Sequence, residues 1–536
     1  MRSIDRLVFS LIVPIFFATT GASNAGDSEK PRLRVLYNSD AGELFADFWT
    51  HAVHEGGTKP EGMAAIIEQS VDEIARVGVD TLSTVIWDRF FSMVPTSAVP
   101  EPNFRYAPLL DAGHDPLAIM LKRCRARRIE FLGCLRMNDR HSGGSMANKG
   151  QFIKDHPEWR LQGAPGGMNY AEKGVRSQLL KYLDEILGRY NLDGIEFDFM
   201  RHCHVFEHGT GEKNAHLLTD FVRKTRRLLN AAAETRKRGR LVLSVRVPQT
   251  LEECRALGFD MATWIREELV DYVVPSDFFY TDFNAKTEDF AELAQSTRVK
   301  IYPALHPVVC HGNRPGLNTL ANYHAAVRNF AARGASGFQT YNYQYHWAGN
   351  HSANYPGPAY MWPGALGYLR ELGDLQKLAQ YNRHYRFYPL WVRQSPTGFV
   401  NDDRIRLGRA DSARREGSRR FRMAEDLNDR TIRATMQFKA VGIAEHEVLE
   451  VRINDRVVPN KHIIRQEDAD GQNKFQGREL DPFANYTIFL SWEGDPPTVP
   501  GDNRLTVRLT DVGDSGEGEV TIEELDVYVS VGRKSR

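Results

Sequence analysis

The segment DGIEFDFMRHCHVFEH, residues 193–208, places acidic residues, an arginine and histidines within and directly after an apolar run. Side chains alternate between the two faces of a strand, so Ile195 and Phe197 should share an apolar face while Glu196 and Asp198 share the other. Charged side chains on a buried face are costly unless they are paired or change their pKa. The pattern therefore predicts a strand that carries two inward-facing carboxyl groups.

Two arginines in other β-rich runs are candidate partners for these carboxyl groups. Arg136 ends the run IEFLGCLR, and Arg246 lies in LVLSVRV. If these runs flank the strand that carries Asp198, the two guanidinium groups would keep this carboxylate ionised. Such a carboxylate suits a nucleophile or a stabiliser of an oxocarbenium-like transition state. The alternative is a buried ion-pair network that takes no part in chemistry.

Hydrolysis of a glycosidic bond by this chemistry needs a second carboxyl group, which acts as an acid. Asp277, in VVPSDFF at the end of another β-rich run, is the first choice. Asp139, Glu196 and Asp88 are further candidates. The predicted catalytic residues are therefore Asp198, Asp277 and Glu196.

Polar and aromatic residues gather in the segments that follow the same runs. Sugars present flat apolar faces together with many hydroxyl groups, so these residue types would suit a sugar-binding site. We expect Trp87, Tyr341 and Trp347 to be exposed, although aromatic residues here could instead cap hydrophobic layers. The candidate substrate contacts are Arg136, Asn138, Asp139, Arg201, His202, Arg246, His306, Tyr341, Asn342 and Trp347.

A metal site is an alternative use of the histidine-rich tail. His202, Cys203, His204 and His208 are zinc ligands by residue type. Metal-dependent hydrolase barrels that use an HxH pair usually carry it after the first strand, where this chain has YNSDAG. We therefore expect no metal or other cofactor, and a metal-dependent hydrolase built on His202 and His204 remains an alternative.

Eight apolar β-rich runs position these residues, and amphipathic helical patterns alternate with them. This alternation predicts an α/β fold, a (β/α)8 TIM barrel over residues 31–385. Connections from helix to strand are short, whereas several from strand to helix are long. Active sites of such barrels lie at the C-terminal ends of the strands, where the long connections fall.

The sequence after about Leu390 changes character, because short runs alternate apolar and polar residues with turns between them. This pattern of short alternating runs predicts a C-terminal antiparallel β-sandwich over residues 390–536. We expect it to be a structural appendage, with a sugar-binding module as the alternative.

The N-terminus and the composition indicate where the protein works. Residues 1–25 combine two arginines, a short apolar run and a small-residue site, as in a signal peptide. The mature protein is therefore expected to be exported, to the periplasm or the exterior, without a membrane span. Lys plus Arg and Asp plus Glu both number 69, which gives no global field that favours nucleic acid. The oligomeric state is not predicted.

Three motifs resemble one known family. YNLDGIEFDFMR, RMNDRH and DHPEWRL are similar, in this order, to motifs of the glycosyl-hydrolase-like family ten barrels. The resemblance implies a secreted carbohydrate-active barrel with Asp198 and Arg201 at its functional rim. Chitinase-type barrels carry a proton-donor Glu where this chain has Met200, so their mechanism does not transfer. A barrel that binds carbohydrate without catalysis is the remaining alternative.

Overall fold

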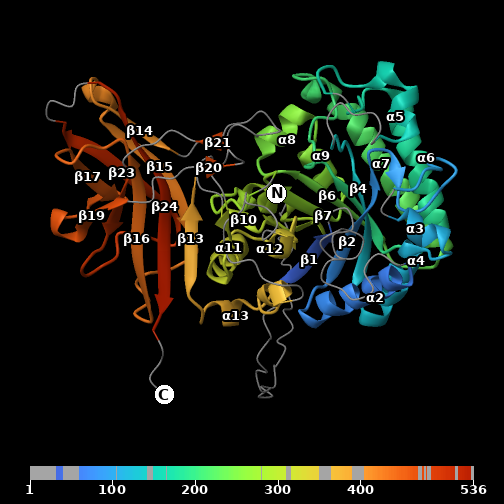
Figure 1. Cartoon of the computed structure of the whole chain (residues 1–536), viewed down its shortest axis with the longest axis horizontal. Helices are drawn as coiled ribbons and strands as arrows, with labels where there is room; N and C mark the ends of the chain where they lie inside the picture. Colours follow the sequence, from blue (N-terminus) through green and yellow to red (C-terminus); the bar gives the residue numbers. More distant parts are fainter. Residues whose placement is uncertain are drawn as a thin grey trace, which may run out of the picture. The chain divides into compact units, whose positions relative to one another are not determined.

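Eight parallel strand positions form the barrel in the computed structural model (Figure 1). They are β1 (Arg34–Ser39), β2 (Thr81–Asp88), β4 (Glu130–Arg136), β5 (Gly194–Asp198), β6 (Val242–Pro248), β7 (Tyr272–Ser276), β8 (Lys300–Ile301) with β9 (Ala304–Leu305), and β12 (Gly337–Thr340). The structure describes residues 32–39, 60–103, 106–141, 149–164, 166–278, 280–309, 316–348, 364–388, 404–468, 474–475, 478–479, 485–512 and 517–532. All eight β-rich runs predicted from the sequence are strands, so the predicted barrel is confirmed.

The seventh strand position, which consists of β8 and β9, closes the barrel. The hydrogen-bonded order is β8-β7-β6-β5-β4-β2-β1-β12-β9, so the sheet begins and ends on the two halves of segment 300–305. β8 pairs with β7 and β9 pairs with β12, both in parallel. The break at Tyr302 and Pro303 thus separates two strand halves that complete one ring.

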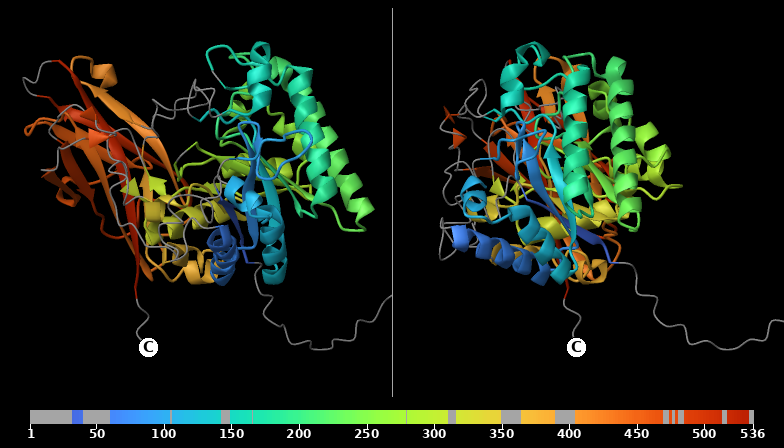
Figure 2. Two further views of the ribbon diagram at one scale, coloured as in Figure 1. Left: turned by 45° about the vertical axis from the view of Figure 1, so that its right-hand side comes forward. Right: turned by 90° about the vertical axis from the view of Figure 1, so that its right-hand side faces the viewer.

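Helices cover the outside of the barrel, and the outward side chains of the strands pack beneath them. The helices are α2 (Pro60–Arg76), α3 (Ala107–Asp111), α4 (Pro116–Arg127), α5 (Gln151–Asp155), α6 (Lys173–Arg189), α7 (Gly211–Thr235), α8 (Leu251–Leu257), α9 (Met261–Arg266), α10 (Thr287–Ala294) and α11 (Leu320–Ala332). The long helices α6 and α7 lie side by side (Figure 2). Phe197 of β5 stacks on Phe221 of α7 with ring centroids 5.4 Å apart.

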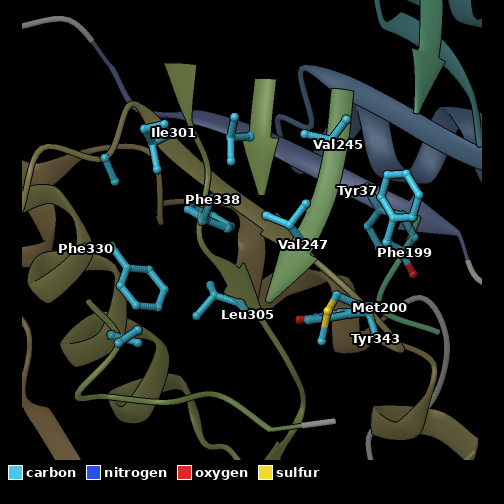
Figure 3. Close-up of a cluster of buried hydrophobic side chains, with 14 of the residues drawn as sticks. Tyr37, Phe199, Met200, Val245, Val247, Ile301, Leu305, Phe330, Phe338 and Tyr343 are labelled. Atoms are coloured by element: carbon cyan, nitrogen blue, oxygen red, sulfur yellow. The ribbon is translucent and has the colours of Figure 1, made fainter. Parts of the chain in front are cut away.

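The alternation predicted for β5 is confirmed by its neighbours. Ile195 and Phe197 are buried in the hydrophobic core, while Glu196 and Asp198 make polar contacts inside the barrel. β6 alternates in the same way, and Val245 and Val247 contribute to the hydrophobic cluster in Figure 3. Two strands therefore present apolar side chains to the helices and polar ones to the barrel interior.

A close backbone approach at Gly194 fixes the start of β5. A Cβ atom there would lie 2.3 Å from the carbonyl oxygen of Val242 on β6. Only glycine avoids this clash. Because Gly194 pairs with Val242, the two strands run in a register that brings Asp198 beside Arg246.

The C-terminal part is a sandwich of two antiparallel sheets, as predicted. One sheet has the order β13-β24-β16-β22-β19 with β14 on β24, and the other has the order β15-β23-β17-β18. Their strands are β13 (Arg383–Phe387), β14 (Ile405–Gly408), β15 (Glu416–Met423), β16 (Ile432–Val441), β17 (Val448–Ile453), β18 (Arg456–Val457), β19 (Ile463–Asp468), β22 (Asn485–Leu490), β23 (Gly501–Asp511) and β24 (Glu519–Val531). The first strand lies before residue 390, so the sandwich includes residues that the sequence assigned to the barrel.

A buried ion-pair network joins α11 of the barrel to this sandwich. Glu425, which follows β15, accepts from Arg383 on β13 at 2.7 Å and from Arg328 on α11 at 3.0 Å. The hydroxyl of Tyr385 also donates to it at 2.8 Å. Burial alone would raise the pKa of Glu425, but the bonds from the two arginines hold it below its ordinary value. Glu425 is therefore a charged link between the two parts.

Two regions differ from, or lie beyond, the expectations. The predicted alternation of strands and helices implies a helix after the last barrel strand, but the described part of the segment from residue 364 onward forms only η5 (Gly364–Leu369) and α13 (Leu375–Leu378). Gly364, Gly367 and Gly373 interrupt it, and glycine disfavours a helix. The predicted signal peptide, residues 1–25, lies outside the described residues. A search of the described helices finds none with the length and apolar character needed to cross a bilayer.

Candidate active site

Three charged side chains lie in register at the C-terminal ends of adjacent strands. Arg136 of β4 pairs with Asp198 of β5, which in turn pairs with Arg246 of β6. Arg246 Nη1 lies 2.7 Å from Asp198 Oδ1, and both side chains are 0% exposed. The same oxygen accepts from the backbone N–H of Met200 at 2.9 Å. Asp198 Oδ2 is buried and has no hydrogen-bond partner in the described part of the chain.

Arg136 does not complete the clamp that the sequence predicted around Asp198. Its Nη1 donates to Asp139 at 3.1 Å and its Nη2 donates to the Tyr341 hydroxyl at 3.1 Å. Burial opposes its charge, but Tyr341, Asp139 and Asp198 together raise the pKa of Arg136 above its ordinary value. Arg136 thus acts on Asp198 through its charge, while Arg246 and the backbone N–H of Met200 donate hydrogen bonds to it.

Arg246 connects Asp198 to the end of β7. Its Nε donates to Ser276 Oγ at 3.2 Å and its Nη2 donates to the carbonyl oxygen of Asp277 at 3.4 Å. Its guanidinium carbon also lies 3.4 Å from the centroid of the Tyr341 ring. These contacts place the backbone of Asp277 close to Asp198. The side chain of Asp277 accepts from the N–H of Tyr280 at 3.0 Å.

Glu196 lies one layer deeper and binds several strands together. Its two oxygens accept from Asn38 at 2.6 Å, Ser83 at 3.0 Å, Ser244 at 3.0 Å and Gln339 at 2.6 Å. These donors come from β1, β2, β6 and β12. Burial raises the pKa of Glu196, while its hydrogen bonds oppose this shift. The geometry favours a structural position for Glu196 inside the barrel.

Two aromatic residues that were expected to be exposed are buried instead. Trp87 is 1% exposed because its ring packs against Phe90 and against Tyr182 of α6, with centroids 4.8 and 4.6 Å away. Tyr341 is 0% exposed and lies beneath the Arg246 guanidinium. Both predictions of exposure were wrong. The side chain of Trp347 lies outside the described residues.

The segments after β9 and β12 contribute buried polar atoms with no partner in the described residues. These atoms are His306 Nδ1 and both side-chain polar atoms of Asn342. His306 is fully buried, and burial together with Arg246 lowers its pKa well below the ordinary value. Asn342 has φ 52°, a strained conformation for a residue other than glycine. Unpaired buried polar atoms and local strain at one rim are typical of a binding site.

Asn138 and Asp139, two predicted substrate contacts on the loop after β4, already have hydrogen-bond partners within the protein. Asn138 is engaged with backbone atoms of Met168 and His204, which indicates that it holds the loop. Asp139 accepts from Arg136 and, at 2.5 Å, from His141 Nδ1. Burial alone would raise the pKa of Asp139, but His141 and Arg136 hold it well below its ordinary value.

The histidine-rich tail does not form a ligand set in the described residues. Nowhere in this part of the chain are three or more His, Cys, Asp or Glu side chains arranged to hold a metal ion. His202 Nδ1 accepts from the N–H of Arg140 at 3.0 Å, and burial lowers the pKa of His202 to about 3. Arg201 bonds to His141 and lies 5.3 Å from the Phe278 ring centroid. The tail therefore contributes polar loop contacts.

Sequence reasoning missed several residues of this site. His141 was not selected, although it follows the motif RMND, and neither were the four donors around Glu196. The inward-facing polar positions of Asn38, Ser83, Ser244 and Gln339 in otherwise apolar runs were the available signal.

No protein-family model matches the chain, and no curated protein matches it. Solved structures similar to it include the GH138 enzyme targeting pectin rhamnogalacturonan II, with a TM-score of 0.40 and 11% identity over 64% of this chain. The chain spans 40% of that enzyme's length. A maltogenic alpha-amylase from Thermotoga neapolitana matches with a TM-score of 0.37 and 10% identity, covering 89% of this chain and 99% of that chain. A chitobiase from Flavobacterium johnsoniae matches with a TM-score of 0.37 and 11% identity, covering 65% and 50%. These neighbours are glycoside hydrolases, and at such scores the likeness concerns the fold alone.

Proposed function

We propose that the protein is an exported glycoside hydrolase that cleaves glycosidic bonds of an oligosaccharide or polysaccharide at the C-terminal face of its barrel. The observation that carries the proposal is the environment of Asp198. One carboxylate oxygen is fixed by Arg246 and the other is buried without a partner in the described residues. A carboxylate held in this way suits the group that attacks or stabilises the anomeric carbon.

The surrounding polar atoms suit a sugar ligand. His306 Nδ1 and the Asn342 amide are buried and lack partners in the described part of the chain. Sugar hydroxyl groups can both donate and accept hydrogen bonds, and so would satisfy these atoms. The resemblance of the motif YNLDGIEFDFMR to glycosyl-hydrolase-like family ten agrees with this reaction class, as the N-terminal pattern agrees with export.

A proton donor to the leaving oxygen is also required. Asp277 remains our candidate, because its backbone lies next to the Arg246 guanidinium that also binds Asp198. Glu196 is a weaker candidate, because four donors already surround its carboxyl group in the deeper layer.

The test is sugar release from a panel of polysaccharides and oligosaccharides by the wild-type protein and by Asp198→Asn. We expect the variant to lose on the order of 10³-fold or more in rate while it still binds the substrate. Asp271→Asn is the matched control, because Asp271 is also a buried aspartate bound to an arginine, Arg226, at 2.5 Å. Asp271 precedes β7 and so lies at the opposite end of the barrel.

The control variant should keep its activity per folded molecule even if it is less stable. Release of sugar that is equal in the wild type and Asp198→Asn would contradict the proposal. Binding of glycans by a wild type that releases nothing from the panel would instead favour a carbohydrate-binding barrel without catalysis.

A further inference from the structure

Three cationic side chains on the loops after β4 and β5 have no ion pair with a carboxylate in the described residues. They are Arg140, Lys149 and Arg201, which we call the cationic subsite. Lys149 is 0% exposed, and the two arginines are half-buried. A buried charge without a counter-charge is costly in a folded protein. A bound anion would offset this cost by supplying the missing negative charge.

The nearby acids already have other partners. Asp88 pairs with Arg89 at 3.0 Å, and Asp139 pairs with Arg136 at 3.1 Å. Burial lowers the pKa of Lys149, Asp139 and Asp88 raise it, and Arg89 and Arg140 lower it. The two acids Asp88 and Asp139 lie near five cationic side chains, which are Arg89, Arg136, Arg140, Lys149 and Arg201. This excess of positive charge favours an incoming anion.

His141 fixes two of these cations in place. Its ring is oriented by Asp139, which lies 2.5 Å from His141 Nδ1. Because Asp139 is an acceptor, the proton belongs on Nδ1, and Nε2 faces the Nη2 of Arg201. The carbonyl oxygen of His141 accepts from Lys149 Nζ at 2.5 Å. The positions of Arg201 and Lys149 are therefore set by contacts with His141, unlike those of freely moving surface side chains.

The cationic subsite adjoins the candidate catalytic carboxylate. Arg201 follows β5, which ends at Asp198, and Arg140 follows β4, which ends at Arg136 in register with Asp198. The guanidinium of Arg201 lies 5.3 Å from the centroid of Phe278. An aromatic ring beside cations suits a sugar ring that carries an acidic substituent.

We propose that Arg140, Lys149 and Arg201 bind the acidic group of an anionic polysaccharide, either the carboxylate of a uronic acid or a sulfate ester. This inference rests on the proposed function for the position of the sugar chain. It goes beyond that function by naming the substrate class.

The test measures binding separately from hydrolysis, by affinity gel electrophoresis of the full chain. The probes are polygalacturonate, chemically carboxyl-reduced polygalacturonate as its neutral counterpart, and a sulfated carrageenan. The wild type should bind at least one acidic polymer about 10-fold or more tightly than the neutral one, with weaker binding at higher salt. Preference for polygalacturonate or for the carrageenan identifies the carboxylate or the sulfate as the group bound.

Lys149→Met and Arg201→Gln should each weaken binding of the acidic polymer by about 10-fold and leave binding of the neutral polymer unchanged. Lys181→Met is the matched control, because Lys181 is exposed on α6, and it should change neither. Lys149→Met should also keep or raise the melting temperature, since it removes a buried charge. A merely structural Lys149 would instead lose stability.

Three outcomes would overturn the inference. The first is that the wild type binds the acidic and neutral polymers equally, the second is that it binds neither acidic polymer, and the third is that both substitutions leave the binding of the acidic polymer unchanged. Hydrolysis of neutral polymers that depends on Asp198 would then leave the proposed function standing. Acidic binding that depends on the cluster, together with no hydrolysis by the wild type, would keep the inference and contradict the proposed function.

Discussion

Arg246 and Asp198 form a fully buried ion pair across neighbouring barrel strands, with Nη1 and Oδ1 2.7 Å apart. Removal of one partner leaves the other charge buried without compensation. We therefore expect Arg246→Met to lower the free energy of unfolding by about 3–5 kcal/mol, as measured by urea denaturation. The double variant Asp198→Asn/Arg246→Met should recover part of this loss, because it buries no unpaired charge at this position. Additive losses in the double variant would contradict the coupling.

Glu196 is expected to stabilise the barrel by linking its strands. In Glu196→Gln, the new amide N–H₂ group cannot accept from donors such as Ser244 and Gln339. The free energy of unfolding should fall by about 2–4 kcal/mol in urea titrations, because hydrogen bonds to a charged group are lost. The rate per folded molecule should change little. Unchanged stability combined with lost activity would instead identify Glu196 as the acid.

Two substitutions of Asn342 can separate the effect of its backbone conformation on stability from the effect of its side chain on activity. Its φ of 52° is readily adopted by glycine, whereas alanine is strained there by about 1 kcal/mol. Asn342→Gly should therefore be more stable in thermal unfolding than Asn342→Ala. Both variants lack the buried amide, so both should lose about 10-fold or more in kcat/KM. Wild-type activity in Asn342→Gly would show that the amide does not contact the substrate.

His346 makes stability dependent on pH. Burial lowers its pKa from 6.5 to about 3, so between these values the unfolded chain binds a proton that the folded chain does not. Stability should therefore fall as the pH falls below about 6.5. Between pH 7 and pH 5 the wild type should lose about 2 kcal/mol more than His346→Gln. Urea titrations at pH 7 and pH 5 measure this difference. If the wild type and His346→Gln lose the same free energy of unfolding between the two pH values, the pKa of His346 is not lowered in the folded protein.

The sequence predicted the barrel and the position of its central carboxylate for a physical reason. Each strand run is locally apolar, and the ends of neighbouring parallel strands must meet, so Arg136, Asp198 and Arg246 could be placed on one rim. Which guanidinium bonds to Asp198 could not be predicted, because that choice depends in part on a side chain from a distant segment. Arg136 bonds to Asp139, three residues later in the sequence, and to Tyr341, which follows β12. The contact with Tyr341 cannot be read from a local pattern.

The errors over exposure have the same origin. Trp87 and Tyr341 are aromatic residues near strand ends, where the sequence cannot distinguish a sugar platform from a packed ring. Tyr182 on α6 covers Trp87, and the Arg246 guanidinium covers Tyr341. The start of the sandwich was misplaced because Arg383–Phe387 forms a strand only by pairing with β24, more than a hundred residues later in the sequence.

The link through Glu425 bears on how the chain as a whole loses its structure. The two arginines that it binds come from α11 of the barrel and from β13 of the sandwich, and Asn322 of α11 donates to the backbone of His384 on β13 at 2.8 Å. Melting of either part would leave buried charge and unmet hydrogen bonds in the other. Barrel and sandwich should therefore denature in one cooperative transition. A chain cut before Arg383 should be less stable than the full chain, because α11 then loses its hydrogen bonds to Glu425 and to the backbone of His384.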